Sequence, residues 1–495
     1  MSTNALIKNS SRFTLTIGLL GCLLTTLFAS QDALAQARFP WDNGKLTVSA
    51  NHRYLVHENG TPFFWLGDTG WLTASRLTRD NMAYYFKACK DNGFNVVQVS
   101  ILHEIPFYNV YGQPALPNGF DFSRVDEPGR YGYWNHVDYM IDAAARQGIY
   151  IGLVCVWGGP VNAGRMTTAD AKAYGTFLAN RYKDKPNIIW IIGGDTKGNV
   201  KQDVWLTLAK TIRGIDKGHL MTYHPRGRTS SADWFNGEDW LDFNMFQSGH
   251  RRYGQRMGDG EYPIEENTEE DNWRFVERAY ALTPAKPVLD GEPSYEAIPH
   301  GLHDMNERYW QAEDVRRYAY WSVFAGSFGH TYGHNAIMQM LTPGVIPSFG
   351  CKKYWYDALN DPGYQQMKYL KALMTTLPFT EGQPDQSLIV GDPGYQHDRL
   401  IATRGADYAL VYTYTGKQMT LDLTRISGAV KRVWWYSPVN GSLSYLGEFS
   451  NGTHTFRPEG GYRGGNDNVL IALDATATYL EPVTPALPIP VSTNR

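Results

Sequence analysis

The sequence predicts a (β/α)8 TIM barrel followed by a smaller antiparallel β-sandwich domain. From about residue 40 to residue 380, short apolar runs alternate with helical patterns, and this alternation is typical of a parallel barrel. From about residue 383 onward, short alternating runs separated by turn residues take over, which is the pattern of an antiparallel sandwich.

Eight runs are expected to form the barrel strands. Each is rich in apolar residues, as expected of a strand that is covered on both faces. They are Phe63–Gly67, Asn95–Leu102, Ile149–Trp157, Ile188–Gly193, Leu220–His224, Phe243–Gln247, Pro287–Gly291 and Ala325–Tyr332.

Helical patterns lie between these runs. Gly93 and Gly148 follow the first two patterns and are good C-terminal stops. A doubly wound open sheet would also alternate strands and helices, but the turn Gly67-Asp68-Thr69-Gly70-Trp71 after the first strand is not a dinucleotide-binding loop. The expected helices are Arg79–Asn92, Trp134–Gln147, Ala169–Tyr182, Val200–Asp216 and Asp314–Phe324.

The first residues have the pattern of a signal peptide. Lys8 and Arg12 precede an apolar run from Phe13 to Ala29, and small residues at positions 33–37 offer a cleavage site. We therefore expect a signal peptide over 1–37, a catalytic barrel over 38–382, a sandwich over 383–480 and a flexible tail over 481–495. The protein is expected to be exported, to the periplasm or outside the cell. Lipidation at Cys22 is a weaker alternative, because the apolar run continues past this cysteine.

Composition narrows the class of ligand. A net charge of -3 gives no general attraction to nucleic acid, and no later stretch approaches the roughly 18 apolar residues of a membrane span. Aromatic residues make up 14% of the chain, which favours carbohydrate binding because sugar faces stack on rings. Beyond the signal peptide, Cys89, Cys155 and Cys351 form neither a disulfide framework nor a zinc site, so no metal or cofactor is expected.

The active site of such a barrel lies at the C-terminal ends of its strands. We expect hydrogen-bonding and aromatic residues at these ends to bind the substrate. They are Asp68, Trp71, His103, Glu104, Trp157, His224, Arg226, Gln247, His250, Tyr295, Tyr332 and His334.

Two acids at these ends are the candidate catalytic pair. Asp195 follows the fourth strand and Glu292 follows the seventh. The retaining glycosidases of the large barrel superfamily carry their acid/base and their nucleophile after these strands, so this arrangement resembles theirs. We assign Asp195 as general acid/base and Glu292 as nucleophile, with Tyr295 or Arg226 as neighbours able to keep Glu292 ionised.

One departure leaves the stereochemistry open. That superfamily has Asn-Glu after its fourth strand, whereas this chain has Gly194-Asp195. Because Asp is one methylene shorter, either the backbone comes closer or the carboxylates lie farther apart. A separation of about 5–5.5 Å predicts retention and one of about 6.5–9.5 Å predicts inversion.

Several motifs together resemble the apiosidase-like family, glycoside hydrolase family 140. They are Gly67-Asp68-Thr69-Gly70-Trp71, the run 190–195 ending in Gly193-Gly194-Asp195, His224-Pro225-Arg226-Gly227, the run 240–250, the run 286–296 with Asp290-Gly291-Glu292-Pro293, and Gly329-His330-Thr331-Tyr332-Gly333-His334-Asn335. The resemblance implies release of D-apiose from plant glycans such as the pectin rhamnogalacturonan II, and catalytic acids at Asp195 and Glu292. The C-terminal region is similar to a sandwich that follows such barrels and carries a collagen-binding label, with its turn at Trp435–Gly441.

Three alternatives remain. A glycosidase of the same fold could act on another furanose or pyranose. A metal-dependent hydrolase could use His103, His224, His250, His330 and His334. A non-catalytic protein could bind glycan or matrix, but it would have no need of two apposed carboxylates.

The other acids near these motifs are given structural roles. Asp290 is expected to hold neighbours in the barrel wall, and Glu296 to lie behind the site or in solvent. The segment Glu261–Asp271 is expected to be a solvated acidic insertion, with a lid as the alternative.

Overall fold

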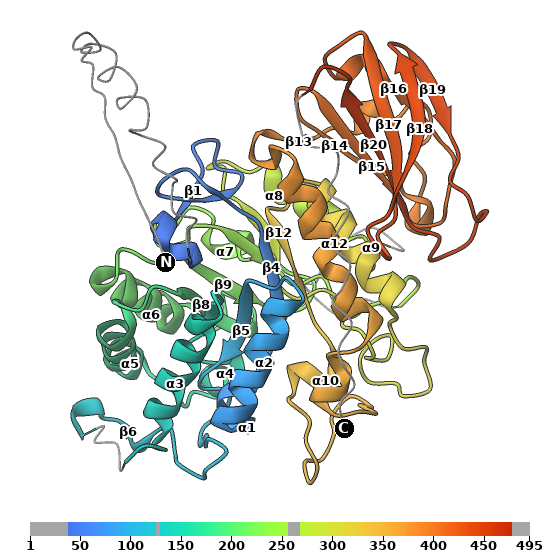
Figure 1. Ribbon diagram of the computed structural model, residues 1–495. Coiled ribbons are helices and arrows are strands. Elements are labelled where there is room, and N and C mark those ends of the chain that lie inside the picture. Colours follow the sequence, from blue (N-terminus) through green and yellow to red (C-terminus); the bar gives the residue numbers. More distant parts are fainter. Residues whose placement is uncertain (1–37, 125–128, 256–267, 478–495) are drawn as a thin grey trace, which may run out of the picture.

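Eight parallel strands form the predicted barrel (Figure 1). The computed structural model describes residues 38–124, 129–255 and 268–477. Neighbours in the sheet run in the order β10-β11-β12-β4-β5-β7-β8-β9. The two outer strands of this order meet, because Asp242 N donates to Met221 O at 2.9 Å and Thr222 Oγ1 donates to Phe243 O at 2.7 Å. The strands are β4 (Trp65–Thr69), β5 (Val96–Ser100), β7 (Tyr150–Val154), β8 (Ile188–Thr196), β9 (Met221–Pro225), β10 (Asn244–Phe246), β11 (Val288–Asp290) and β12 (Gly329–Tyr332).

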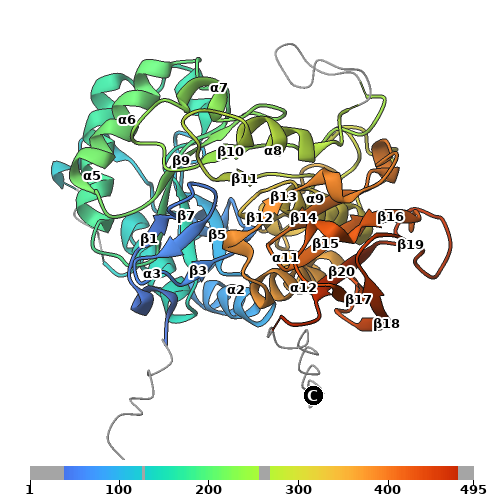
Figure 2. The same cartoon turned by 90° about the horizontal axis from the view of Figure 1, so that it is seen from above.

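Helices cover the outside of the barrel, so its strands are buried on both faces (Figures 1 and 2). Local signals set the helix ends. The Thr78 side chain accepts from Asn81 N at the start of α2, and Gly93 and Gly148 have φ of 82° and 73° just after α2 and α3. The five expected helices are confirmed as α2 (Arg79–Asp91), α3 (Tyr133–Arg146), α5 (Thr168–Tyr182), α6 (Gln202–Ile215) and α9 (Ala312–Phe324).

Further elements complete the barrel domain. The helices are α1 (Thr73–Arg76), α4 (Gly158–Asn162), α7 (Ala232–Phe235), α8 (Asn272–Tyr280), α10 (Asn335–Met338), α11 (Trp355–Ala358) and α12 (Pro362–Thr376). The strands are β1 (Leu46–Val48), β2 (Leu55–His57), β3 (Pro62–Phe63) and β6 (Pro117–Phe120).

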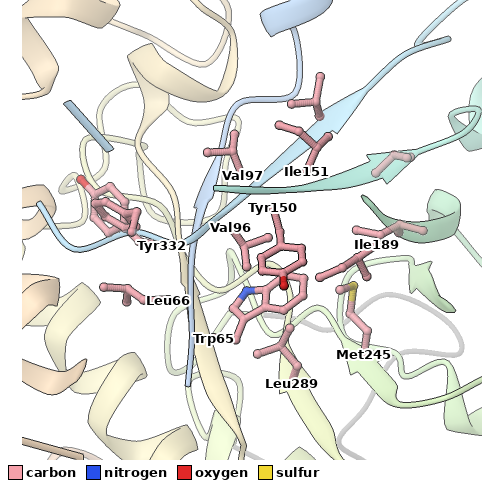
Figure 3. Close-up of a cluster of buried hydrophobic side chains, with 14 of the residues drawn as sticks. Trp65, Leu66, Val96, Val97, Tyr150, Ile151, Ile189, Met245, Leu289 and Tyr332 are labelled. Atoms are coloured by element: carbon pink, nitrogen blue, oxygen red, sulfur yellow. The ribbon is translucent and has the colours of Figure 1, made fainter. Parts of the chain in front are cut away.

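Large apolar side chains pack on both faces of the barrel strands (Figure 3). Trp65 is fully buried, and its indole N–H donates to Thr331 Oγ1 at 3.0 Å. Phe243 and Phe328 pack edge-on to its ring. The barrel is therefore a packed core and not a channel, and in barrels of this kind the site lies at the C-terminal ends of the strands.

The C-terminal region is the predicted antiparallel sandwich (Figure 1). One sheet has the order β13-β14-β15-β20-β17-β18, and β16 pairs with β19. The strand β18 lies at the edge of this sheet, and most of its side chains are exposed. Such a strand has no regular alternation of apolar and polar residues that would predict it from the sequence. The strands are β13 (Gln383–Pro384), β14 (Ile401–Arg404), β15 (Tyr408–Thr413), β16 (Met419–Asp422), β17 (Val430–Tyr436), β18 (Leu443–Ser450), β19 (Thr453–Phe456) and β20 (Asn468–Asp474).

The sandwich packs against the barrel at α9 (Figure 2). Arg316 on α9 forms a buried two-point ion pair with Asp467, with Nε to Oδ2 at 2.8 Å and Nη2 to Oδ1 at 2.7 Å. The ring of Tyr320 stacks on that of Tyr412 at 5.0 Å. A buried ion pair with two hydrogen bonds, together with stacked rings, makes this a specific interface.

The acidic segment corrects one expectation. Its part 261–267 lies outside the described residues, but Glu269, Glu270 and Asp271 are buried rather than solvated. Glu270 lies 2.5 Å from Arg317 and 3.1 Å from His397. Burial raises the pKa of Glu270, but the charge of Arg317 and the contact with His397 outweigh it and lower the pKa to about 2. Glu270 is buried because Arg317 of the barrel and His397 of the sandwich contact it.

Two of the predicted segments are at the chain ends, which the structure does not describe. The predicted signal peptide, with the Cys22 alternative, and the predicted tail lie outside the described residues. In the described part of the chain, Cys89, Cys155 and Cys351 are free and buried. No helix there is long and apolar enough to span a membrane.

Candidate active site

A cavity of about 370 Å³ lies at the C-terminal ends of the barrel strands, and both candidate acids line it. Asp195 is the second-last residue of β8, and Glu292 lies two residues after the end of β11. Asp195 is exposed to the cavity, whereas Glu292 is 7% exposed. The fold thus brings together two carboxylates that are almost 100 positions apart in the sequence.

An irregularity in β8 presents Asp195. Gly193 pairs with His224 and Thr196 with Pro225, so Gly194 and Asp195 form an extra bulge. Gly194 has φ of 144° and Asp195 has φ of 48°. A Cβ on Gly194 would lie 2.7 Å from the Trp157 ring. Glycine is required at position 194, and the bulge sets the position of the Asp195 backbone.

Two histidines hold Glu292. His224 Nε2 lies 3.1 Å from Glu292 Oε2, and His250 Nε2 lies 3.2 Å from Glu292 Oε1. Burial raises the pKa of Glu292, but the contacts with His224 and His250 outweigh it and lower the pKa. Tyr295 also interacts with Glu292, because its hydroxyl pKa is raised by burial and then by that carboxylate. The expected neighbour Tyr295 is thus present, and the two histidines are the main cause of the shift.

Asp195 is shifted in the opposite direction. Asp195 opens to the cavity, but the surrounding protein still removes much of its water; this desolvation and then the charge of Glu292 raise its pKa from 3.8 to about 6. His224 also contacts this residue, since the Asp195 backbone N–H donates to His224 Nδ1 at 3.3 Å. With Nδ1 as acceptor, Nε2 carries the proton and faces Glu292. One carboxyl is therefore held ionised while its neighbour is inclined to stay protonated, which is the division that acid–base chemistry needs.

Further contacts fix the loop that carries Glu292. Gln98 inside the barrel donates to Gly291 O at 2.7 Å. Gly249 N donates to Glu292 O at 3.0 Å. Asp290 is fully buried and accepts from Ser248 Oγ at 2.5 Å and Asn272 Nδ2 at 3.0 Å. Asp290 thus holds its neighbours in the barrel wall, as expected.

Aromatic rings form one wall of the cavity. The rings of Trp71 and Trp157 lie 5.2 Å apart, and the ring of His103 lies 4.6 Å from Trp157. Trp71 Nε1 donates to Tyr295 OH at 3.2 Å, which fixes the indole. A rigid aromatic wall opposite polar groups suits a molecule with apolar C–H faces and hydroxyl edges.

Most of the predicted substrate-binding residues lie at or beside the cavity. The cavity is lined by Trp71, His103, Trp157, Arg226, Gln247, His250 and Tyr295. His224 is fully buried directly behind Glu292. Glu104 is exposed and lines an adjoining cavity instead.

Three predicted residues do not reach the cavity. Asp68 is fully buried and faces the helix layer, where it accepts from Tyr85 OH at 2.7 Å, and its pKa is raised to about 7 by burial. Tyr332 donates to Glu296 at 2.5 Å behind the barrel. His334 pairs with Asp361 at 2.8 Å. Strand residues alternate between the inside and the outside of a barrel, so nearness to a strand end does not place a side chain in the site.

Sequence reasoning missed residues supplied by loops. Ile298, Leu302 and His303 come from the loop after β11, and Met338 and Phe349 from the segment after β12. These loops are long and carry no regular pattern that predicts which residues turn inward. Arg228, which follows the fifth strand in the sequence, also lines the cavity; it is 1% exposed and donates to Ser248 O at 2.9 Å.

The histidines do not form a metal-binding group. His330 is buried beside Ser322, and His334 pairs with Asp361. Across 38–124, 129–255 and 268–477, no group of three or more His, Cys, Asp or Glu side chains has an arrangement that could hold a metal ion.

Comparison with known proteins agrees with this geometry. Residues 49–381 match the family described as apiosidase-like, catalytic domain. Residues 383–473 match a domain described as "Putative collagen-binding domain of a collagenase". No curated protein matches the chain.

Solved structures give a second line of comparison. A structure named glycoside hydrolase is 62% identical, with a TM-score of 0.88, covering 90% of this chain and all of that one. A glycoside hydrolase family 5 structure from Bacteroides vulgatus is 61% identical, also with a TM-score of 0.88, covering 90% of this chain and 97% of its own. At 16% identity and a TM-score of 0.60, another structure from that organism shares the fold.

The family match spans most of the chain and includes the cavity with Asp195 and Glu292. The chain is a glycoside hydrolase that belongs to the apiosidase-like family.

Proposed function

We propose that this glycoside hydrolase releases terminal D-apiose from apiosylated plant glycans such as rhamnogalacturonan II, by a retaining two-carboxylate mechanism. The observation that carries the proposal is that Asp195 and Glu292 line one cavity at the barrel mouth, with a histidine against each oxygen of Glu292. The family match supports apiose as the sugar.

In the first step, Glu292 attacks the anomeric carbon while Asp195 gives its proton to the leaving oxygen. The glycosidic bond breaks and a covalent glycosyl-enzyme forms. In the second step, Asp195 takes a proton from water, and the water oxygen displaces the Glu292 carboxylate. The sugar leaves with its original anomeric configuration, and both acids return to their starting protonation states.

The histidines maintain the nucleophile in this mechanism. His224 and His250 lie against both oxygens of Glu292, so the carboxylate is ionised before the sugar arrives. The Glu292 charge in turn helps to keep Asp195 protonated. When Glu292 becomes an ester, that charge disappears and Asp195 ionises more readily, as its second role as a base requires.

The cavity supports removal of a single sugar. Its volume of about 370 Å³ suits one ring rather than a long chain. Trp71 and Trp157 offer ring faces to the sugar, and Arg226 and Gln247 offer hydrogen-bonding groups to its hydroxyls. Export of the protein, proposed from residues 1–37, would bring this site to polysaccharide outside the cytoplasm; the N-terminal sequence of the mature protein tests it.

A substrate panel tests the proposal. Purified protein is incubated with 4-nitrophenyl glycosides of apiose, other furanoses and common pyranoses, and with rhamnogalacturonan II oligosaccharides. We expect nitrophenol release from the apioside and free apiose from the oligosaccharides. Hydrolysis of a different glycoside would overturn apiose as the sugar, and absence of hydrolysis throughout would overturn the proposed activity.

A further inference from the structure

A second cavity adjoins the one that holds the carboxylates. Its volume is about 510 Å³. The two cavities share four lining residues, Trp71, His103, Met338 and Phe349, so they meet along one wall. Asp195 and Glu292 do not line the second cavity. It therefore extends the site without sharing the reacting groups.

The wall of this second cavity is held in place before any ligand arrives. Arg76 Nη1 donates to Gln339 O at 2.6 Å. The buried Gln339 side chain in turn donates to Asn335 Oδ1 at 2.8 Å and accepts from Ser348 N at 2.9 Å. Arg76 and the segment after β12 thus form a preorganised surface, and binding there would cost little ordering.

Opposite charges line this surface together. Burial lowers the pKa of the half-buried Arg76, and the charge of Glu104 acts against that shift. Arg76 offers donors and the exposed Glu104 offers acceptors. Because the two charges offset each other, the surface suits a neutral polyhydroxylated ligand, whose hydroxyls both donate and accept.

An aromatic ring completes the cavity. Tyr108 is 49% exposed and lines it. A short hairpin holds this residue, with Ala115 N donating to Phe107 O at 2.8 Å and Asn109 N donating to Gln113 O at 3.0 Å. An exposed ring beside a donor–acceptor pair is the combination that binds a sugar through one C–H face and its hydroxyl edges.

We propose that this second cavity binds a second sugar unit of the same glycan, joined to the sugar held at Asp195 and Glu292. The inference rests on the proposed function and adds a subsite to it. The second unit is attached through the leaving oxygen, because the proposed function releases a terminal apiose.

The test compares two substrates in three variants. The substrates are methyl apiofuranoside, whose leaving group is too small to reach the second cavity, and apiose-containing rhamnogalacturonan II oligosaccharides. The variants are Tyr108→Ala, Tyr108→Phe and the control Tyr445→Ala, at a tyrosine 55% exposed on β18 of the sandwich. We expect Tyr108→Ala to raise KM for the oligosaccharide about tenfold, from the loss of one stacking contact, and to leave the methyl glycoside within about twofold. Tyr108→Phe keeps the ring face, so it and the control should behave like the wild type.

Each result has a definite meaning. If Tyr108→Ala changes neither substrate, or both equally, the second subsite is overturned while the proposed function stands. If the wild type hydrolyses neither substrate, the proposed function fails and the subsite falls with it. When the expected split is seen, free apiose as the product confirms that the second sugar lies on the leaving side.

Discussion

His224 Nε2 lies 3.1 Å from Glu292 Oε2. The other ring nitrogen of His224 accepts the Asp195 backbone N–H at 3.3 Å. One fully buried imidazole thus contacts both catalytic candidates, which ties the position of the acid to the charge of the nucleophile.

Removing this imidazole should raise the pKa of Glu292, so that its carboxylate becomes protonated at a higher pH. In His224→Ala, one of the two contacts that lower the Glu292 pKa is lost, so that pKa rises. We expect kcat/KM to fall about 10- to 100-fold and the acidic limb of its pH profile to move to higher pH. His454→Ala on the sandwich is the matched control. An acidic limb that does not move would argue against this role of His224.

The pH profile of the wild type should be bell-shaped with an acidic optimum. Glu292 must be ionised, and its pKa is lowered, so activity is lost only when the pH falls far below the usual carboxyl range. Asp195 must be protonated, and its pKa is about 6, so activity is lost as the pH rises above that value. Plots of kcat/KM against pH report these free-enzyme values. A profile still rising between pH 7 and pH 9 would contradict the assignment.

The bulge in β8 should not accept a side chain at Gly194. In Gly194→Ala, the new Cβ would lie 2.7 Å from the Trp157 ring, on a residue whose φ is 144°. We expect at least a tenfold loss of kcat/KM, because small displacements of a catalytic group are costly. The control Gly159→Ala, on α4, meets nothing within 4 Å and should retain activity. Equal activity of the two variants would show that the bulge does not position Asp195.

The buried Arg316–Asp467 pair between the barrel and the sandwich should contribute to the free energy of unfolding. Asp467→Ala leaves a buried guanidinium without its partner and should lower the free energy of unfolding by about 3–5 kcal/mol. The exposed pair Lys87–Asp91 is the comparison, and Asp91→Ala should cost less than about 1 kcal/mol. Denaturant unfolding followed by tryptophan fluorescence measures both. Similar losses in the two variants would contradict a structural role for the interface pair.

The barrel could be predicted because its signals are local. Each apolar run ends near a glycine, a proline or a polar residue, and this spacing marks the strands. Asp195 and Glu292 could be selected by counting strands, since topology brings the fourth and seventh strand ends to one mouth.

Other features depend on contacts distant in sequence. Asp68 faces Tyr85 on α2 rather than the cavity, which follows from strand parity and from a shift of β4 by two residues relative to the expected Phe63–Gly67. Glu270 is buried because Arg317 and His397 meet it from two domains. Leu302 and Phe349 enter the cavity from irregular loops. No pattern within a short stretch of sequence predicts these contacts.

The central claim is that Glu292 is the nucleophile and Asp195 the acid/base. The most direct test is the intact mass of Asp195→Asn after mixing with 4-nitrophenyl apiofuranoside. The activated leaving group needs no acid, while hydrolysis of the intermediate lacks its base, so we predict that one glycosyl group accumulates on Glu292 and is located there by peptide mapping. Glu292→Gln should show no adduct. An unmodified Asp195→Asn protein with near-normal turnover, or an adduct on another residue, would contradict the account.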